Sequence, residues 1–217
     1  MNTSLVMPTG TTGSQNKTTF LFRKESVRKT APLFCLLLIN AAFSFGQTTY
    51  TGTTVDLVVS GTSTLHDWSM KSAKANCAAV FAFNNAGQIT GLTSLSFSTP
   101  VNSLKSEHSG MDKNAYKALK SDKNPAITYT MASVSVTPSA AGASTIKCTG
   151  KLTIAGATLN ADIVAVCKQN ADNTITVTGS RAISMKDFNM EPPTFMLGTV
   201  KTGNDVVLKF NLVLKKS

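Results

Sequence analysis

The sequence predicts an all-β fold in which roughly eight antiparallel strands bury an apolar face against one another. Apolar and polar residues alternate with a period of two along most of the chain after Gln47, as in half-buried strands. Turn-forming Gly, Asn and Pro residues separate the alternating runs. Only 111–120 has helical spacing, and one short helix cannot cover so many strands. The sheet is therefore expected to close on itself as a barrel or to pack as a sandwich.

The alternation of apolar and polar residues predicts eight strands between residue 54 and the end of the chain. The expected strands are 54–60, 73–83, 92–101, 127–136, 145–154, 159–167, 174–185 and 206–215. The alternation is clearest in 145–154, where Ile146, Cys148 and Leu152 share one face and Thr and Lys residues occupy the other. Within 111–120, Met111, Ala115 and Leu119 form one apolar stripe, which predicts the short helix.

The first 46 residues are expected to be a signal peptide. Basic residues between Arg23 and Lys29 precede an apolar run, 31–45, and Gly46 offers a small-residue cleavage site. The run is shorter than the roughly 20 residues needed to span a bilayer. We therefore expect one domain, 47–217, that is periplasmic or secreted.

The charge of this domain excludes a nucleic-acid partner. Removing the five basic residues of the leader and Glu25 lowers the formal net charge from +10 to +6. The remaining lysines are scattered, and Arg181 is the only arginine left, whereas nucleic-acid binding needs clustered Arg and Lys. A mild positive charge does permit transient contact with an anionic membrane surface.

Small residues on the predicted apolar faces favour a hollow interior. They are Cys148, Gly150, Ala161, Ala165, Cys167 and Gly179. The interior of an eight-stranded barrel is just wide enough to be filled by side chains or to hold one ligand. Small inward residues favour the ligand, although Phe81, Phe83, Phe97 and Phe210 are large enough to refill the space.

Several segments together resemble the YceI-like family of exported proteins. They are TSTLHDW, the Ser103-Leu104 corner, MDKNAYKALKSDKNPAITY, CTGKLTIAGATLNADI, and the final ISMKDFNM and VKTGNDVVLKFNLVLKK. The resemblance implies an antiparallel eight-stranded, lipocalin-like barrel with its short helix near one end. It also implies an apolar channel that holds a polyisoprenoid, such as a quinone or a polyprenyl phosphate, and no other cofactor. Many relatives carry arginines where this chain has Met111 and Met185, which disfavours a pyrophosphate headgroup more than a neutral quinone.

The stretch Gly61–Met70 has two interpretations. Adjacent residues on a strand point to opposite faces, so His66 and Asp67 form no catalytic pair unless a turn bends them. The first interpretation is a strand-end corner in which Leu65 and Trp68 are buried and the side chains of His66 and Asp67 bond local backbone. The second places His66 and Trp68 at the mouth of the cavity, beside the ligand headgroup.

Arg181 and the cysteines also leave alternatives open. The period of two puts Arg181 on an apolar face, where an unpaired charge is costly. A bulge after Gly179 would turn it outward; otherwise it would bind a headgroup. Cys77, Cys148 and Cys167 allow one disulfide, but a hairpin near Ala155-Gly156 does not place Cys148 opposite Cys167, so we expect buried, unpaired thiols.

We therefore expect an exported carrier or storage protein for an isoprenoid-like lipid, without catalysis. The candidate ligand-binding residues are His66, Trp68, Phe81, Phe97, Met111, Leu119, Tyr129, Met131, Ile183 and Phe210. One alternative is an outer-membrane barrel, although few aromatic residues are present to form its girdles. The other is a metal-dependent enzyme using His66 and His108, for which no HxxxH or HExxH spacing is found.

Overall fold

The computed structural model describes residues 47–139 and 142–217, so the predicted signal peptide lies outside the described residues. The strands are β1 (Gln47–Ser63), β2 (Trp68–Ser72), β3 (Asn76–Phe83), β4 (Ile89–Pro100), β5 (Ala126–Pro138), β6 (Ala143–Ile154), β7 (Ala157–Gln169), β8 (Ile175–Ser184), β9 (Thr194–Phe195) and β10 (Val200–Lys216). The helix α1 spans Ser109–Ala118, and 3-10 turns occupy η1 (Val101–Ser103), η3 (Lys186–Phe188) and η4 (Met196–Gly198).

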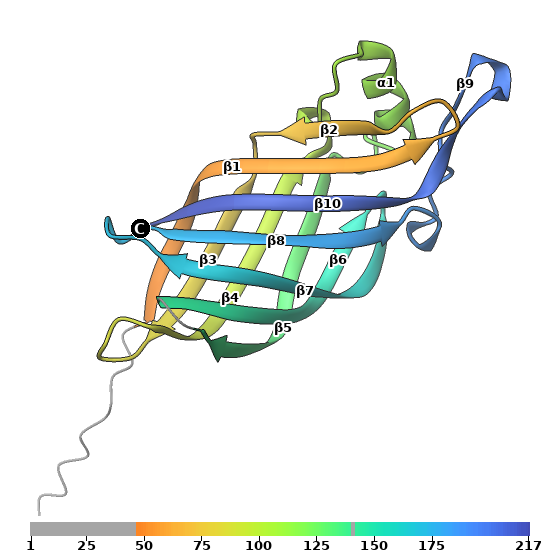
Figure 1. The fold of residues 1–217 in the computed structure, drawn as a ribbon. Coiled ribbons are helices and arrows are strands. Elements are labelled where there is room, and N and C mark those ends of the chain that lie inside the picture. Colours follow the sequence, from red (N-terminus) through yellow and green to blue (C-terminus); the bar gives the residue numbers. More distant parts are fainter. Residues whose placement is uncertain (1–46, 140–141) are drawn as a thin grey trace, which may run out of the picture. The chain divides into compact units, whose positions relative to one another are not determined.

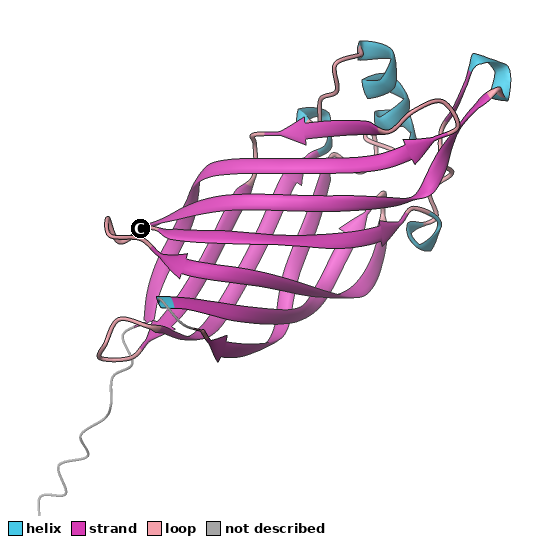
Figure 2. Cartoon of the chain, in the orientation of Figure 1, coloured by secondary structure: helices cyan, strands magenta, loops and turns pink. Residues whose placement is uncertain are grey.

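The strands close into an antiparallel barrel (Figures 1 and 2). Its order is β1-β3-β4-β5-β6-β7-β8-β10, and β10 returns to pair with β1. That last pairing runs from Tyr50 opposite Lys216 to Ser63 opposite Thr202. The predicted eight-stranded, lipocalin-like barrel with one α-helix at one end is therefore confirmed for the described residues.

Two short strands were not predicted. β2 pairs with the end of β1 from Leu57 opposite Ser72 to Gly61 opposite Trp68, whereas β3 pairs with the beginning of β1, from Gln47 to Thr51. β9 pairs with β10 through two residues. Both strands extend the wall at the end that carries α1, and both are too short to show a clear alternation of their own.

The two ends of the barrel are filled differently. At the end where β1 begins, Tyr50 and Phe81 pack edge to face with ring centres 5.6 Å apart, and Phe83 lies 6.1 Å from Tyr50. Ile89 and Ile175 are almost completely buried beside them. Aromatic and branched side chains therefore close this end, which we call the packed end.

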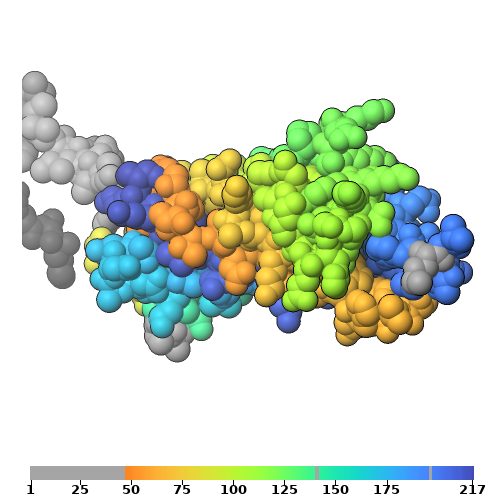
Figure 3. Space-filling model, turned by 90° about the horizontal axis from the view of Figure 1, so that it is seen from above, coloured from red at the N-terminus to blue at the C-terminus, as the bar shows by residue number. Residues whose placement is uncertain are grey.

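At the opposite end, which we call the mouth, the connections are longer. α1 lies between β4 and β5, and the 185–199 segment lies between β8 and β10. In the space-filling view of Figure 3, these green and blue segments gather at the same end as the orange 63–68 loop. Within the described ranges, no helix has the length and hydrophobicity needed to cross a membrane.

Candidate functional site: an apolar cavity inside the barrel

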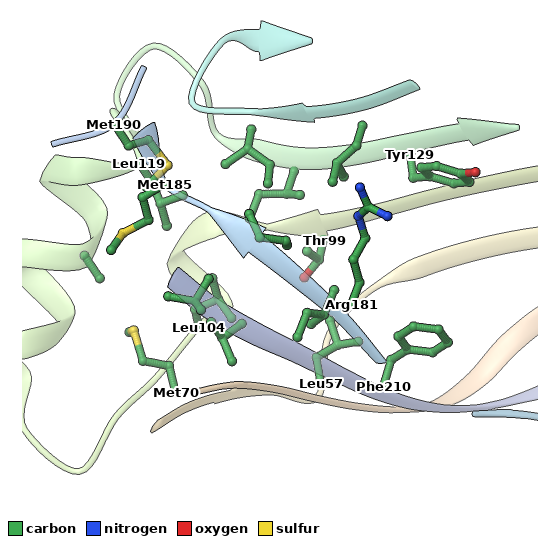
Figure 4. A pocket seen from close by; sticks show the side chains of 18 of the residues that line it. Leu57, Met70, Thr99, Leu104, Leu119, Tyr129, Arg181, Met185, Met190 and Phe210 are labelled. Carbon is green, nitrogen blue, oxygen red and sulfur yellow. The ribbon is translucent and has the colours of Figure 1, made fainter. Parts of the chain in front are cut away.

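A cavity of about 550 Å³ occupies the barrel between the packed end and the mouth. This volume lies in the usual range for small-molecule sites, about 300–1,000 Å³. All eight barrel strands, β2, α1 and the 185–202 segment contribute to its wall, and almost every contributing side chain is apolar (Figure 4). Since these apolar side chains face inward, the strands use their hydrophobic face to line a lumen.

The inner face of α1 covers part of the mouth. Met111, Ala115 and Leu119 border the cavity, as their spacing predicts. The hydroxyl of Tyr116 donates to the carbonyls of Leu104 at 2.7 Å and Asn102 at 3.1 Å. These bonds hold the helix on the corner that follows β4.

A buried carboxylate anchors the start of α1. Asp112 is 7% exposed and accepts hydrogen bonds from the backbone N–H of Ser106 at 2.7 Å and from its hydroxyl at 2.8 Å. The ammonium group of Lys105 lies 3.6 Å away. Burial favours the neutral acid, but the hydrogen bonds from Ser106 and the charge of Lys105 outweigh it and hold the pKa of Asp112 below its ordinary value.

The other end of α1 contacts the segment after β8. Lys120, in the left-handed conformation at φ 53°, donates from Nζ to the carbonyl of Asn189 at 3.1 Å. Met185 and Met190 are buried in that segment and lie near Leu119 in Figure 4. Flexible methionines thus line the part of the cavity where the helix meets the strands.

The 63–68 loop is a corner built on Ser63. Its hydroxyl donates to the carbonyl of His66 at 2.7 Å and accepts from the N–H groups of His66 and Leu65. Trp68 Nε1 donates to the carbonyl of Thr62 at 3.0 Å, and its ring lies where a side chain at Gly61 would be. The expected burial of Leu65 is wrong: that side chain borders the cavity but is 67% exposed, because the tight turn keeps it at the rim.

Both histidines lie at the rim of the cavity. His66 and His108 border it, and both are exposed. His66 Nδ1 donates to the carbonyl of Asp67 at 2.7 Å, the local backbone contact expected of a corner residue. Among residues 47–139 and 142–217, no group of three or more His, Cys, Asp or Glu side chains is placed to hold a metal ion.

The structure brings most of the sequence-predicted site residues to the cavity wall. Those that border it are His66, Trp68, Phe97, Met111, Leu119, Tyr129, Ile183 and Phe210. Phe81 belongs instead to the packed end, and Met131 packs against the core without bordering the cavity. Whether the eight residues contact a ligand stays a prediction.

Two of the small inward residues do not create space. A side chain at Gly179 would meet the ring of Phe210 and the carbonyl of Val164, and one at Gly150 would meet the ring of Tyr129. The aromatic residues fill the space left by both glycines. The predicted contribution of small residues to the cavity holds for Cys148, Ala165 and Cys167, which border it.

The three cysteines of the described chain are buried and unpaired. Cys148 lies opposite Ile163, and Cys167 lies opposite Ser144, which confirms the predicted register. Burial raises the pKa of Cys77 and Cys148 to about 11 and that of Cys167 to about 12. Because only the thiolate is a good nucleophile, these thiols are unreactive at neutral pH.

Arg181 faces the lumen. The ladder between β8 and β10 is continuous, with Gly179 opposite Phe210 and Arg181 opposite Leu208. The expected bulge after Gly179 is therefore absent, and the expected outward turn is wrong. Arg181 borders the cavity with Ile183, and Figure 4 shows it between the helix-end side chains and the pair formed by Tyr129 and Phe210.

Several cavity residues were not named from the sequence. Leu208 and Val206 share the inner face of β10 with Phe210, so the alternation alone would have found them. Met190, Pro193 and Phe195 also border the cavity, but they lie in an irregular segment. No periodic pattern signals their position.

Solved structures with related folds include two bacterial proteins. Burkholderia cenocepacia BcnA is 18% identical, with a TM-score of 0.59 over 73% of this chain and 95% of its own. A polyisoprenoid-binding domain from Saccharophagus degradans, implicated in plant cell wall breakdown, is 12% identical, with a TM-score of 0.57 over 79% of this chain and 99% of its own. At these identities the likeness concerns the fold alone.

A search among curated proteins finds no sequence match. The model of the YceI-like domain, however, matches residues 39–214. This match covers most of the chain and includes every barrel strand from β3 to β8 together with α1. The chain belongs to the YceI-like family.

Proposed function

We propose that this protein binds an isoprenoid-like lipid, a quinone or a polyprenyl chain, inside its barrel and acts as a carrier or store without catalysing a reaction. The observation that carries the proposal is the cavity of about 550 Å³ with its nearly continuous apolar wall. An apolar surface left in water costs roughly 25 cal/mol for each Å², and a flexible hydrocarbon is well suited to cover it. The family match and the polyisoprenoid-binding domain of similar fold support the same class of ligand.

The inward direction of the apolar side chains favours this function over an outer-membrane barrel. In β6, Ile146, Cys148 and Leu152 are buried or border the lumen, whereas the lysines at 147 and 151 are on the outer face. Lysine on a lipid-facing surface is costly. An exported carrier, as the leader suggests, needs a polar exterior of this kind.

Transient contact with a membrane surface is part of the proposal. The two most exposed large apolar side chains of the described residues are Leu65 and Leu197, and both lie in loops at the mouth. These loops adjoin, because Thr64 N–H donates to the carbonyl of Lys201 at 3.0 Å, next to the β9–β10 turn. The leucines would enter the bilayer at the point where a lipid enters or leaves the cavity.

Organic extraction of protein purified from its native host tests the proposal. We expect a near-stoichiometric isoprenoid lipid in the extract, identified by mass spectrometry. Lipid-free protein that also takes up no isoprenoid in a direct titration would contradict the proposed function.

A further inference from the structure

Arg181 is the only Arg, Lys, Asp or Glu among the described residues that border the cavity. It lies on the inner face of β8, between Gly179 and Ile183, and is half-buried. The other polar side chains of the wall come from the loops, α1 and strand ends near the mouth, apart from Thr99 and Tyr129. The Tyr129 hydroxyl is already bonded to the carbonyls of Cys148 and Ala161. A single cation therefore interrupts an otherwise apolar lumen.

One edge of this guanidinium group has a structural role. Nη1 donates to the backbone carbonyl of Asp162 on β7. The ladder between β7 and β8 stops at Ala165 opposite Gly179, so this bond joins the two strands just beyond their last backbone pair. This bond from Nη1 explains the direction of the Arg181 side chain, but Nε and Nη2 of the guanidinium group take no part in it.

The opposite edge has no partner in the described part of the chain. Arg181 Nε is fully buried and makes no hydrogen bond. The carboxylate of Asp162 makes no ion pair with Arg181, because its two oxygens bond Thr149 at 2.8 Å and Lys147 at 3.0 Å on the outer face. The pKa of Asp162 is lowered by these two bonds and also by the charge of Arg181, so the two groups attract each other without direct contact. The lumen is thus bordered by a positive charge that has no directly bonded counter-ion among the described residues, and the same group has a covered N–H donor without a partner.

An entirely hydrocarbon ligand would make this arrangement costly. It would displace water from Arg181 and leave a desolvated charge without a counter-ion. A ligand with two negatively charged oxygens would instead neutralise this charge through Nη2. A small shift of the side chain would uncover Nε, which protein atoms cover, and allow the parallel two-bond geometry that arginine forms with carboxylates and phosphates.

We propose that Arg181 binds the oxyanion headgroup, a carboxylate or a phosphate, of an apolar ligand and holds it inside the barrel. This inference rests on the proposed function and specifies its ligand. The headgroup would lie beside Leu208 and Ile183 and not in the water at the mouth. The hydrocarbon chain would occupy the apolar parts of the lumen.

Titration of delipidated protein with three probes of the same hydrocarbon chain tests the proposal. The probes are farnesyl phosphate, farnesoic acid and the neutral alcohol farnesol. Since hydrogen bonds to charged groups contribute about 1.5–3 kcal/mol, we expect the preferred oxyanion to bind roughly 10- to 100-fold more tightly than farnesol. Comparison of the two acids distinguishes a phosphate from a carboxylate as the preferred group.

Variants of Arg181 separate headgroup binding from barrel integrity. Arg181→Met should abolish the preference for the oxyanion while farnesol binding persists. Lys186→Met, which removes an exposed lysine just after β8, should keep the preference. Should Arg181→Met fail to fold by circular dichroism, Arg181→Gln retains a donor for the Asp162 carbonyl and should show the same loss of preference.

Two results would overturn the inference while the proposed function stands. One is equal affinity of the wild-type protein for all three probes, or a higher affinity for a short-chain quinone than for either acid. The other is a preference for the oxyanion that survives in the folded Arg181 variants. Failure of the wild-type protein to bind any of the probes or the quinone would count against the proposed function itself.

Discussion

The packed end and the cavity are built by the same strands with the same alternation, but different side chains fill them. At the packed end, rings from two neighbouring strands, β1 and β3, pack against one another, with Tyr50 against Phe81 and Phe83. Toward the mouth, most inward positions carry aliphatic and sulfur-containing side chains, and the rings of Phe97, Tyr129 and Phe210 border the cavity without closing it. The packing of inward side chains against one another therefore decides which part of a small barrel is solid and which is hollow.

The polar groups of the two regions differ in the same way. Ser144, at the packed end, is 1% exposed and donates to the carbonyl of Ile89 at 3.0 Å, so its hydroxyl is satisfied within the protein. Arg181, in the cavity, has a buried nitrogen without a partner. A satisfied polar group stabilises a fold, whereas a charged side chain on a cavity wall that lacks a bonded counter-ion indicates a ligand that would complete it.

The largest effect is expected from removing a ring at the packed end. Phe81→Ala should destabilise the delipidated protein by about 3–5 kcal/mol, because it leaves a void in a fully packed region. Phe97→Ala, which shortens a half-buried ring on the cavity wall, should cost clearly less, because space is already present there. Urea unfolding of both variants measures the difference. Equal destabilisation would mean that the cavity is not hollow in solution.

Filling the cavity should remove the ligand without unfolding the barrel. Ala165 borders the cavity, and Ala165→Phe should reduce the co-purifying lipid to a minor fraction of the wild-type amount. The matched control is Val166→Phe, one residue along β7, where the side chain is 44% exposed on the outer face. Lipid extraction with protein quantification compares the two. Undiminished lipid in the Ala165 variant would place the ligand elsewhere.

Glycine positions on the inner face are unsuitable for this experiment. Gly179→Leu is an obvious way to fill the lumen from the sequence, since Gly179 lies on the inner face of β8. A side chain there would meet the carbonyl of Val164, which is backbone and cannot move aside cheaply. The variant would disturb the wall of the barrel, and any loss of lipid would have two explanations.

The fold was predictable from the sequence because alternation and turns are local signals. The inner face of β6 and the apolar stripe of α1 both follow from spacing alone. Alternation also placed Arg181 on the inner face. The wrong expectation of an outward turn came from the rule that a charge avoids an apolar face, because that rule assumes a solid interior. Leu65 was misplaced for a related reason: hydrophobicity predicted burial, but the Ser63 turn determines where that side chain points.

The mouth differs from the outer wall in carrying exposed leucines on loops, and membrane binding should depend on them. The double variant Leu65→Asp, Leu197→Asp should weaken binding to anionic phosphatidylglycerol vesicles by about tenfold or more, since full burial of each leucine is worth about 1.5–3 kcal/mol. The control is Val166→Asp on the outer wall. Vesicle co-sedimentation at two salt concentrations measures binding. Equal binding of both variants to the vesicles would mean that the two leucines do not contribute and that electrostatic attraction alone explains membrane binding.

The smallest effect on stability is expected at the start of α1. Here the mouth depends on the charge of Asp112, whereas the packed end depends on no charge among the described residues. The pKa of Asp112 is lower in the folded protein than its ordinary value of 3.8. Its contribution to stability is therefore complete above this ordinary pKa and is lost as the pH falls through the lower, folded value. Asp112→Asn should lower the melting temperature of the protein near neutral pH, by about 2–4 °C for each kcal/mol lost.

The difference between Asp112→Asn and the wild-type protein should then shrink as the pH falls below the ordinary value of 3.8, because the wild-type carboxylate becomes neutral as the pH passes through its lower, folded pKa. Glu107→Gln serves as the control, because this exposed carboxylate near the same helix start accepts no hydrogen bond among the described residues. Thermal melts between pH 3 and pH 7 measure the effect. A difference that stays constant over this range would mean that Asp112 acts through its shape and not its charge.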